Sequence, residues 1–269
     1  MSIIKQNFEK MSITKIINAK NRFKLTVITA YDALFAKLFS QSADIILVGD
    51  SLNMSFAGKD DTLSATLDQM IYHTNAVCNG AKDSFVVMDM PFGTYINKDE
   101  ALKNCVKVYK KTAASAVKIE GGEDRADIVK HLTSNSIAVM GHIGLMPQYV
   151  RSVGGYKVRG KTKNDAEQLI RDAIAIEKAG AFCIVIEGVM SDVAQKITQA
   201  VSIPTIGIGA GKECDGQVLV WSDMLGFFED FKPKFVRHYL NGAKLVKDAV
   251  NSYRDDVQTQ NFPSKEEEY

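Results

Sequence analysis

Short apolar runs rich in β-branched residues recur along the whole chain. Within each run the apolar positions are continuous rather than alternating, which is typical of parallel strands that are buried on both faces. The pattern predicts strands at Leu25–Thr29, Ile45–Val48, Phe85–Met88, Ala116–Ile119, Ile137–Met140, Cys183–Ile186, Thr205–Ile208 and Gln217–Val220.

Helical patterns lie between most of these runs. The clearest is Asp165–Ala179, which carries an apolar face at helical spacing and is followed by Gly180 as a stop signal. With a strand about every 34 residues, the spacing matches one βα unit. The pattern predicts an α/β fold and favours a closed (β/α)8 TIM-type barrel; an open doubly wound sheet remains an alternative, because periodicity does not show closure. Further helices are predicted at Ser64–Gly80, Lys98–Thr112, Glu123–Thr133 and Pro233–Val250.

The repeat divides the chain into three parts. Residues 1–22 form an N-terminal extension with a short helix expected at Ser12–Asn18, and residues 23–253 form the barrel. Residues 254–269 form a polar tail that ends in Lys-Glu-Glu-Glu-Tyr. We expect the chain to be polar and mobile from Ser252 onward. No composition shift marks a linker between domains.

Composition and charge exclude several classes of protein. The 33 Lys and Arg residues and 32 Asp and Glu residues give a net charge of +1, so no charge excess favours nucleic acid or an anionic membrane. No stretch approaches the ~18 apolar residues of a membrane span, and the first residues lack the pattern of a signal peptide. The 4 cysteines have no metal-ligand spacing. We therefore expect a cytoplasmic protein with reduced thiols that acts on a small molecule.

Polar residues close five of the predicted strands. They are Asp50 after the second run, Asp89 after the third, Glu120 after the fourth, His142 after the fifth and Glu187 after the sixth. In a barrel, the carboxyl ends of the strands meet at one face, where active sites form. We therefore expect these side chains to gather at one mouth.

Two interpretations of these acids are open. Any one of them could be the N-cap of the following helix, since Asp caps well. Glu caps weakly, and each acid follows its strand directly, so the set together favours a site. Clustered carboxylates raise one another's pKa values unless a cation joins them. Carboxylates without Cys or paired His favour Mg²⁺, then Mn²⁺, over Zn²⁺.

The same residues lie within longer motifs, and through these the chain resembles the ketopantoate hydroxymethyltransferase (3-methyl-2-oxobutanoate hydroxymethyltransferase) family. The resemblance runs from about Ile13 to Tyr253, with many motifs in one order. It rests on Thr29–Asp32, Val48–Leu52, Asp89–Phe92, Val117–Gly122, Gly141–Leu145 with Pro147-Gln148, Gly154–Val158, Ile206–Gly211 and Asp215–Val220.

The resemblance implies a fold, a reaction and a set of site residues. The fold is a (β/α)8 barrel. The reaction is Mg²⁺-assisted enolisation of 3-methyl-2-oxobutanoate and transfer of a hydroxymethyl group from 5,10-methylenetetrahydrofolate, which gives 2-dehydropantoate for pantothenate and coenzyme A biosynthesis. By motif, Asp50, Asp89 and Glu120 match the metal ligands and Glu187 the catalytic base; the positions that match substrate contacts are Asp50, Ser51, Asp89, Lys118 and His142.

The resemblance also implies assembly into a decamer of two pentameric rings. An interface between copies would bury the apolar segment Ile13–Ile17. The other partners that the resemblance implies are the small-molecule 2-oxo acid and the folate.

Two competing functions remain. The phosphoenolpyruvate mutase and isocitrate lyase group also uses a barrel, Mg²⁺ and acids at the strand ends to act on small oxo acids, but it does not account for Gly-Gly-Tyr-Lys-Val at Gly154–Val158. A non-catalytic metabolite-binding barrel would retain the fold without needing a base such as Glu187. A substrate screen separates all three.

Overall fold

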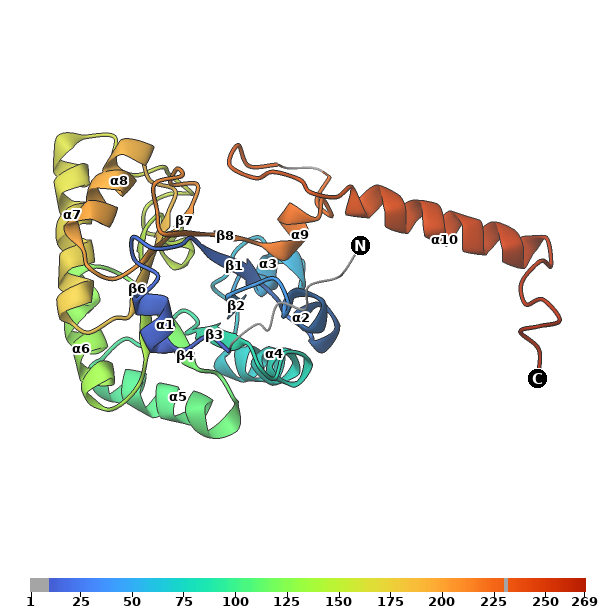
Figure 1. The fold of residues 1–269 in the computed structure, drawn as a ribbon, viewed down its shortest axis with the longest axis horizontal. Helices are drawn as coiled ribbons and strands as arrows, with labels where there is room; N and C mark the ends of the chain where they lie inside the picture. The colour runs from blue at the N-terminus through green and yellow to red at the C-terminus, as the bar shows by residue number, and fades with distance from the viewer. Residues whose placement is uncertain (1–9, 230–231) are drawn as a thin grey trace. The chain divides into compact units, whose positions relative to one another are not determined.

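The computed structural model describes residues 10–229 and 232–269 of the chain. Across these residues, eight parallel strands pair in chain order and β8 pairs back with β1, so the sheet is closed (Figure 1). This confirms the predicted barrel, and the open-sheet alternative is wrong. The strands are β1 Leu25–Thr29, β2 Ile45–Val48, β3 Phe85–Asp89, β4 Ala116–Glu120, β5 Val139–Gly144, β6 Cys183–Glu187, β7 Thr205–Ile208 and β8 Gly216–Leu219.

Helices surround this sheet (Figure 1). Several begin where the sequence supplies a cap: Thr66 and Gln69 form a reciprocal capping box at the start of α4, and the Thr162 side chain accepts a hydrogen bond at the start of α7. The helices around the barrel are α2 Ala33–Phe39, α3 Leu52–Ser55, α4 Leu67–Gly80, α5 Lys98–Lys111, α6 Ala126–Ser134, α7 Lys163–Lys178 and α8 Ser191–Ala200, with 3₁₀ turns η1 Glu123–Arg125 and η2 Pro147–Tyr149.

The barrel interior changes from apolar to polar along the strands. On β3, Val87 belongs to the buried interior cluster, and Asp89 is the next residue on the same face. On β6, Val185 and Glu187 repeat the arrangement. Successive side chains of a strand point to opposite faces, so every second residue points inward. The same alternation places Lys118, Glu120 and His142 inside the barrel at its C-terminal end.

A short N-terminal helix, α1 Ile13–Ile17, closes the other end of the barrel. The Ser12 side chain accepts a hydrogen bond from the Lys15 N–H, and Ile16 is fully buried in one cluster with Leu25 and Phe85, the first residues of β1 and β3. The helix predicted at Ser12–Asn18 is therefore confirmed. Of the apolar segment Ile13–Ile17, Ile16 is buried within this chain's own barrel, whereas Ile17 is 37% exposed. Residues 1–9 of the predicted extension lie outside the described residues.

We expect Ile16→Ala to lower the free energy of unfolding by about 2–5 kcal/mol, the usual range for truncating a fully buried aliphatic side chain. The neighbouring Ile17 is 37% exposed, so Ile17→Ala provides the matched control and should cost well under half as much. Urea denaturation followed by circular dichroism measures both. Equal losses for the two variants would mean that α1 is not anchored in the barrel.

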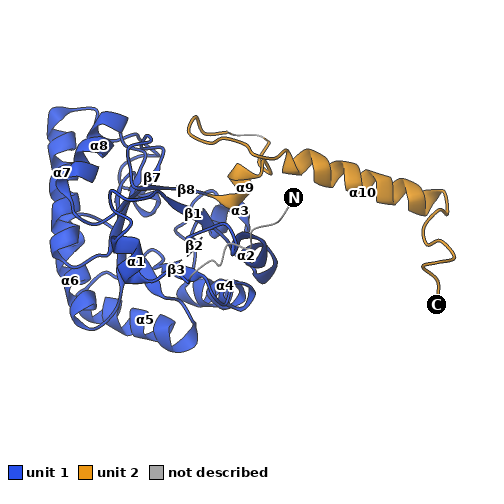
Figure 2. Ribbon diagram, viewed as in Figure 1, with its two compact units in different colours: residues 1–219 blue, residues 220–269 orange. Residues whose placement is uncertain are grey.

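Residues Val220–Tyr269 form a second compact unit, which contains α9 Trp221–Met224 and α10 Gly242–Gln258 (Figure 2). The helix predicted at Pro233–Val250 is wrong at both ends. The Asn241 side chain accepts a hydrogen bond from the Lys244 N–H and so caps α10 at its observed start. The helix then continues past the predicted boundary between 253 and 254, so the first residues of the predicted polar tail are helical.

In residues 10–229 and 232–269, no helix combines the length and the apolar character needed to cross a membrane.

Candidate active site

The pairing register of three strands brings Lys118 between an acid and a histidine. Asp89 on β3 pairs with Lys118 on β4, and Glu120, two residues further, pairs with His142 on β5. The Lys118 Nζ lies 3.2 Å from the Asp89 Oδ2 and 3.1 Å from the His142 Nδ1. All four side chains are buried. Strand register therefore accounts for this cluster, although its members are far apart in the sequence.

The turn after β2 adds Asp50 and Ser51. A Cβ at Gly49 would lie 2.7 Å from the Ser51 Oγ, so only glycine fits this turn without displacing the serine. The Asp50 N–H donates to the Asp89 Oδ2 at 3.1 Å. The Ser51 Oγ lies 2.9 Å from the Tyr31 hydroxyl. The turn thus holds the Asp50 backbone against the end of β3 and the Ser51 side chain against Tyr31, which follows β1.

Glu187 lies at the open side of the cluster. Its Oε2 is 3.2 Å from the His142 Nε2, and its side chain is 21% exposed, whereas the Asp89, Lys118 and Glu120 side chains are 4% exposed or less. β5 approaches closely here: a Cβ at Gly144, which has a φ of +101°, would lie 2.3 Å from the Glu187 carbonyl oxygen. Glu187 is therefore the acid in this cluster with the most direct access to a bound molecule.

The predicted site residues gather at one end of the barrel. The strands extend further than the apolar runs predicted. Asp89, Glu120 and Glu187 are the last residues of β3, β4 and β6. β5 runs from Val139 to Gly144, so His142 lies within this strand and not after it. The residues brought together by the contacts above are Asp50, Ser51, Asp89, Lys118, Glu120, His142 and Glu187.

Burial and neighbouring charges shift the pKa values of this cluster. Burial, together with repulsion from Asp89 and Glu120, raises the pKa of Asp50 well above its usual value. Burial lowers the pKa of Lys118, but Asp89 and Glu120 outweigh it and raise the pKa, so the side chain remains a cation. For His142, burial and the charge of Lys118 lower the pKa, but the neighbouring carboxylates of Glu120 and Glu187 outweigh them, and the pKa rises to about 9.

The carboxylates have the properties of a cation site. Among the described residues, the Asp89 Oδ1 and the Glu120 Oε1 are buried and accept no hydrogen bond. Buried acceptors without donors, beside carboxylates that repel one another, suit an oxygen-preferring divalent cation. Within the described ranges, no group of three or more His, Cys, Asp or Glu side chains is already arranged around a common metal position. The donor set therefore fits Mg²⁺ in chemistry, while Lys118 contacts Asp89 in this arrangement.

Gln148 is a site residue to which the sequence assigned no role. Its Nε2 donates to the Asp50 Oδ2 at 2.8 Å and to the Met90 carbonyl at 2.9 Å, and its N–H donates to the Glu120 Oε2 at 3.1 Å. The Tyr95 hydroxyl donates to the Gln148 Oε1. The Pro-Gln pair after β5 was visible only as part of a motif, since a loop glutamine carries no spacing signal of its own.

Comparison with known proteins identifies close relatives over the full chain. The family model for ketopantoate hydroxymethyltransferase matches residues 10–265. A 3-methyl-2-oxobutanoate hydroxymethyltransferase from Aliarcobacter butzleri (strain RM4018) is 82% identical over 269 residues, 100% of both chains. Proteins of the same name from Sulfurimonas denitrificans (strain ATCC 33889 / DSM 1251) and Helicobacter pylori (strain ATCC 700392 / 26695) are 67% identical over 255 residues and 54% identical over 269 residues. The match to the Sulfurimonas protein covers 95% of this chain and 97% of that protein, and the match to the Helicobacter protein covers 100% of both.

Solved structures share the barrel at low identity. Phosphoenolpyruvate phosphomutase from Streptomyces platensis subsp. rosaceus has a TM-score of 0.61 at 13% identity, covering 93% of this chain and 88% of its own. Phosphonopyruvate hydrolase, solved with oxalate and Mg²⁺, has a TM-score of 0.60 at 15% identity, covering 96% and 93%. At such identities the likeness shows the fold alone, so it adds no weight to the lyase and mutase alternative.

Proposed function

Since the chain belongs to the ketopantoate hydroxymethyltransferase family, we propose that its barrel mouth converts 3-methyl-2-oxobutanoate to 2-dehydropantoate. The chain is an enzyme of the hydroxymethyltransferase class. One observation carries the assignment to this mouth: the partly exposed Glu187 lies beside a buried lysine, histidine and carboxylate cluster. That arrangement provides a base for removing a proton next to a ketone and positive charge for the enolate that results.

The oxo acid is held by a fixed cation and by the turn after β2. Lys118 is buried and charged, so its ammonium attracts the carboxylate of the substrate in a site from which water is largely excluded. The Ser51 hydroxyl supplies a further hydrogen bond at the same end of the barrel. Asp50, Asp89 and His142 surround this position and fix the orientation of the bound acid.

We assign Asp50, Asp89 and Glu120 as the residues that hold Mg²⁺, supported by the buried Asp89 Oδ1 and Glu120 Oε1, which have no donor among the described residues, and by Asp50, whose N–H donates to Asp89. When bound, Mg²⁺ supplies Lewis-acid polarisation of the keto group and lowers the energy of the enolate. The three carboxylates also bring the compensating negative charge that lets a divalent cation and Lys118 occupy one mouth.

Glu187 accepts the proton from C3 of the oxo acid. His142, 3.2 Å from the Glu187 Oε2, orients the carboxylate. The electron pair of the broken C–H bond becomes the enolate, whose C3 then bonds to the methylene carbon of 5,10-methylenetetrahydrofolate. Water supplies the hydroxyl oxygen to the same carbon, and both bonds from that carbon to N5 and N10 of the folate break. The proton removed from C3 and one proton of the water end on these two nitrogens. The products are 2-dehydropantoate and tetrahydrofolate.

Proton NMR of 3-methyl-2-oxobutanoate in D₂O tests the proposed function. The enzyme, Mg²⁺ and methylenetetrahydrofolate together should yield hydroxymethyl product, and EDTA should abolish it. Omitting the folate should leave only exchange of the C3 proton. Exchange without product in the complete mixture would contradict the folate cosubstrate, and an untouched C3 signal in every mixture would contradict the reaction.

We also propose that the enzyme is a homo-oligomer, with the decamer of the family as the expected form. Support comes from α10, where Val246, Val250, Tyr253 and Val257 recur at helical spacing and are exposed. Light scattering of the purified protein measures the mass. The cytoplasm is the proposed compartment, in keeping with four described cysteines that are free and buried.

A further inference from the structure

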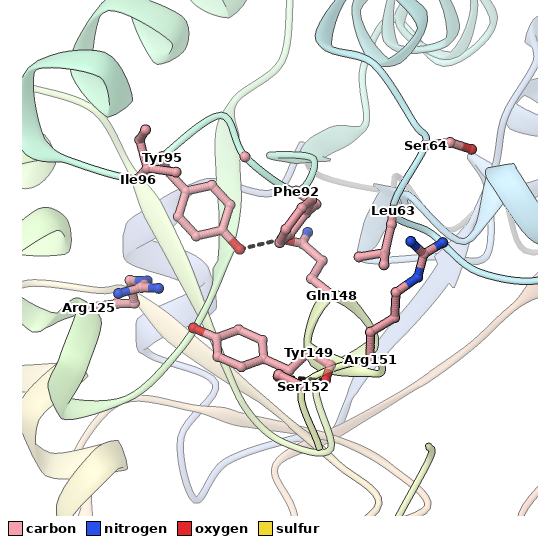
Figure 3. A pocket seen from close by; sticks show the side chains of 11 residues that line it. Leu63, Ser64, Phe92, Tyr95, Ile96, Arg125, Gln148, Tyr149, Arg151 and Ser152 are labelled. Carbon is pink, nitrogen blue, oxygen red and sulfur yellow. Dashed lines mark hydrogen bonds between the residues drawn. The ribbon is translucent and has the colours of Figure 1, made fainter. Parts of the chain in front are cut away.

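A separate pocket opens beside the carboxylate cluster. It has a volume of about 490 Å³, within the range of small-molecule sites. Aromatic rings of Phe92, Tyr95 and Tyr149 line it, together with Arg125 and Arg151 (Figure 3). These residues come from the loops after β3, β4 and β5, at the same end of the barrel as Glu187.

Gln148 connects this pocket to the proposed oxo-acid site. Its side chain lines the pocket and accepts a hydrogen bond from the Tyr95 hydroxyl, while its amide nitrogen donates to the Asp50 Oδ2. A molecule in the pocket is therefore separated from the carboxylate cluster by a single side chain. The pocket is thus a neighbour of the proposed oxo-acid site, as a site for a second substrate that passes a group to the first has to be.

The two arginines of the pocket differ in how many of their guanidinium donors already contact an acceptor. Arg151 makes two hydrogen bonds to the Asp61 Oδ2, at 2.9 and 3.2 Å. Arg125 pairs with one acid among the described residues: its Nη1 lies 3.3 Å from the Asp124 Oδ2. Its Nε is buried and donates to no atom of the described residues. A buried donor without an acceptor has a strong tendency to bind one. Arg125 is thus the guanidinium of this pocket with capacity left for an anion.

We propose that this pocket binds the one-carbon donor, a flat aromatic heterocycle that carries a carboxylate tail. The rings stack on Phe92 and Tyr149, and the tail carboxylate pairs with Arg125. This inference rests on the proposed function and deepens it, because it assigns contacts to the second substrate. The combination fits that chemistry: aromatic faces bind planar rings, and guanidinium binds carboxylate with two hydrogen bonds. The small aliphatic oxo acid has no ring to stack on the aromatic side chains, and its carboxylate is already assigned to Lys118.

Donor variants on wild-type and Arg125→Met enzyme test the carboxylate contact. The donors are methylenetetrahydrofolate and the matching methylenetetrahydropteroyl amide, in which a neutral amide replaces the glutamate and no carboxylate remains. For the wild type, loss of the glutamate should lower kcat/KM about tenfold or more, as expected for one charge-assisted contact. For Arg125→Met, the same loss should change kcat/KM less than about threefold. Phe92→Leu should raise the KM of both donors alike by about threefold to tenfold.

Two controls separate the pocket from the rest of the enzyme. Arg22→Met changes an exposed arginine before β1, at the opposite end of the barrel, and should retain the wild-type preference for glutamate. C3-proton exchange of the oxo acid without folate should be unchanged in both pocket variants. Normal transfer with the full glutamate preference in Arg125→Met would overturn the pocket assignment alone. Loss of C3-proton exchange in both pocket variants would mean that the pocket is part of the oxo-acid site, which also overturns the pocket assignment. If the wild type itself shows neither exchange nor product, the proposed function is wrong.

Discussion

Glu187→Gln should lower the rate of hydroxymethyl transfer by about 10³-fold, in the middle of the range for removing a general base. The amide has the shape of the carboxylate, so it retains the position beside His142, but it does not accept the C3 proton. Binding of the oxo acid should stay within about threefold of the wild type, because Lys118 and Ser51 are unchanged. Transfer rate, C3 exchange in D₂O and calorimetric binding of the oxo acid measure the three effects separately.

An exposed glutamate supplies the control for this variant. Glu167 on α7 is 51% exposed and contacts only Lys163 among the ion pairs of the described residues, so Glu167→Gln should retain full activity. C3 exchange at the wild-type rate in Glu187→Gln would remove the glutamate from its role as base. Loss of oxo-acid binding in parallel with exchange would make it a binding residue instead.

Asp89→Asn should raise the Mg²⁺ concentration for half-maximal activity by about 100-fold, the upper end of the losses seen when contacts at a metal site are removed. The asparagine oxygen would keep the hydrogen bond from the Asp50 N–H. The amide nitrogen would then replace the Oδ1, which is buried and accepts no hydrogen bond from the described residues. An amide nitrogen is a donor and does not bind a cation, so the variant removes one ligand and one charge with little change of shape.

Direct binding of Mn²⁺, followed by electron paramagnetic resonance, measures this loss without relying on activity. Asp127→Asn is the matched control, because the Asp127 side chain is 86% exposed and pairs with Lys98 at the surface. It should bind Mn²⁺ like the wild type. Unchanged Mn²⁺ affinity in Asp89→Asn would show that this acid is not a ligand.

The apolar runs predicted the strands well because a strand buried on both faces requires continuous apolar residues. Strand β5 was the exception. Gly141 and His142 interrupt its apolar run, so the pattern ended the strand at Met140, although its pairing continues to Gly144. The predicted bounds of helix α10 were also wrong, because the apolar pattern did not locate its start. Its start is decided by the Asn241 cap and not by the apolar positions before it.

The acids of the site could be found from the sequence because Asp89, Glu120 and Glu187 end their strands and Asp50 lies two residues after β2. Gln148 could not, because its importance lies in contacts with Asp50 and Met90, far away in the sequence. The same holds for the donor pocket, whose aromatic and basic residues come from separate loops. Local patterns carry no information about such long-range neighbours.

By itself, the sequence determined the number and order of the strands, the carboxylates, lysine and histidine at their ends, and the family to which these motifs belong. Only the tertiary structure decided that β1 pairs with β8, that Lys118 lies between Asp89 and His142, and that Glu187 is more exposed than the other acids. The physical reason is that strand propensity is a local property, whereas closure, register and exposure depend on pairing between residues distant in the chain.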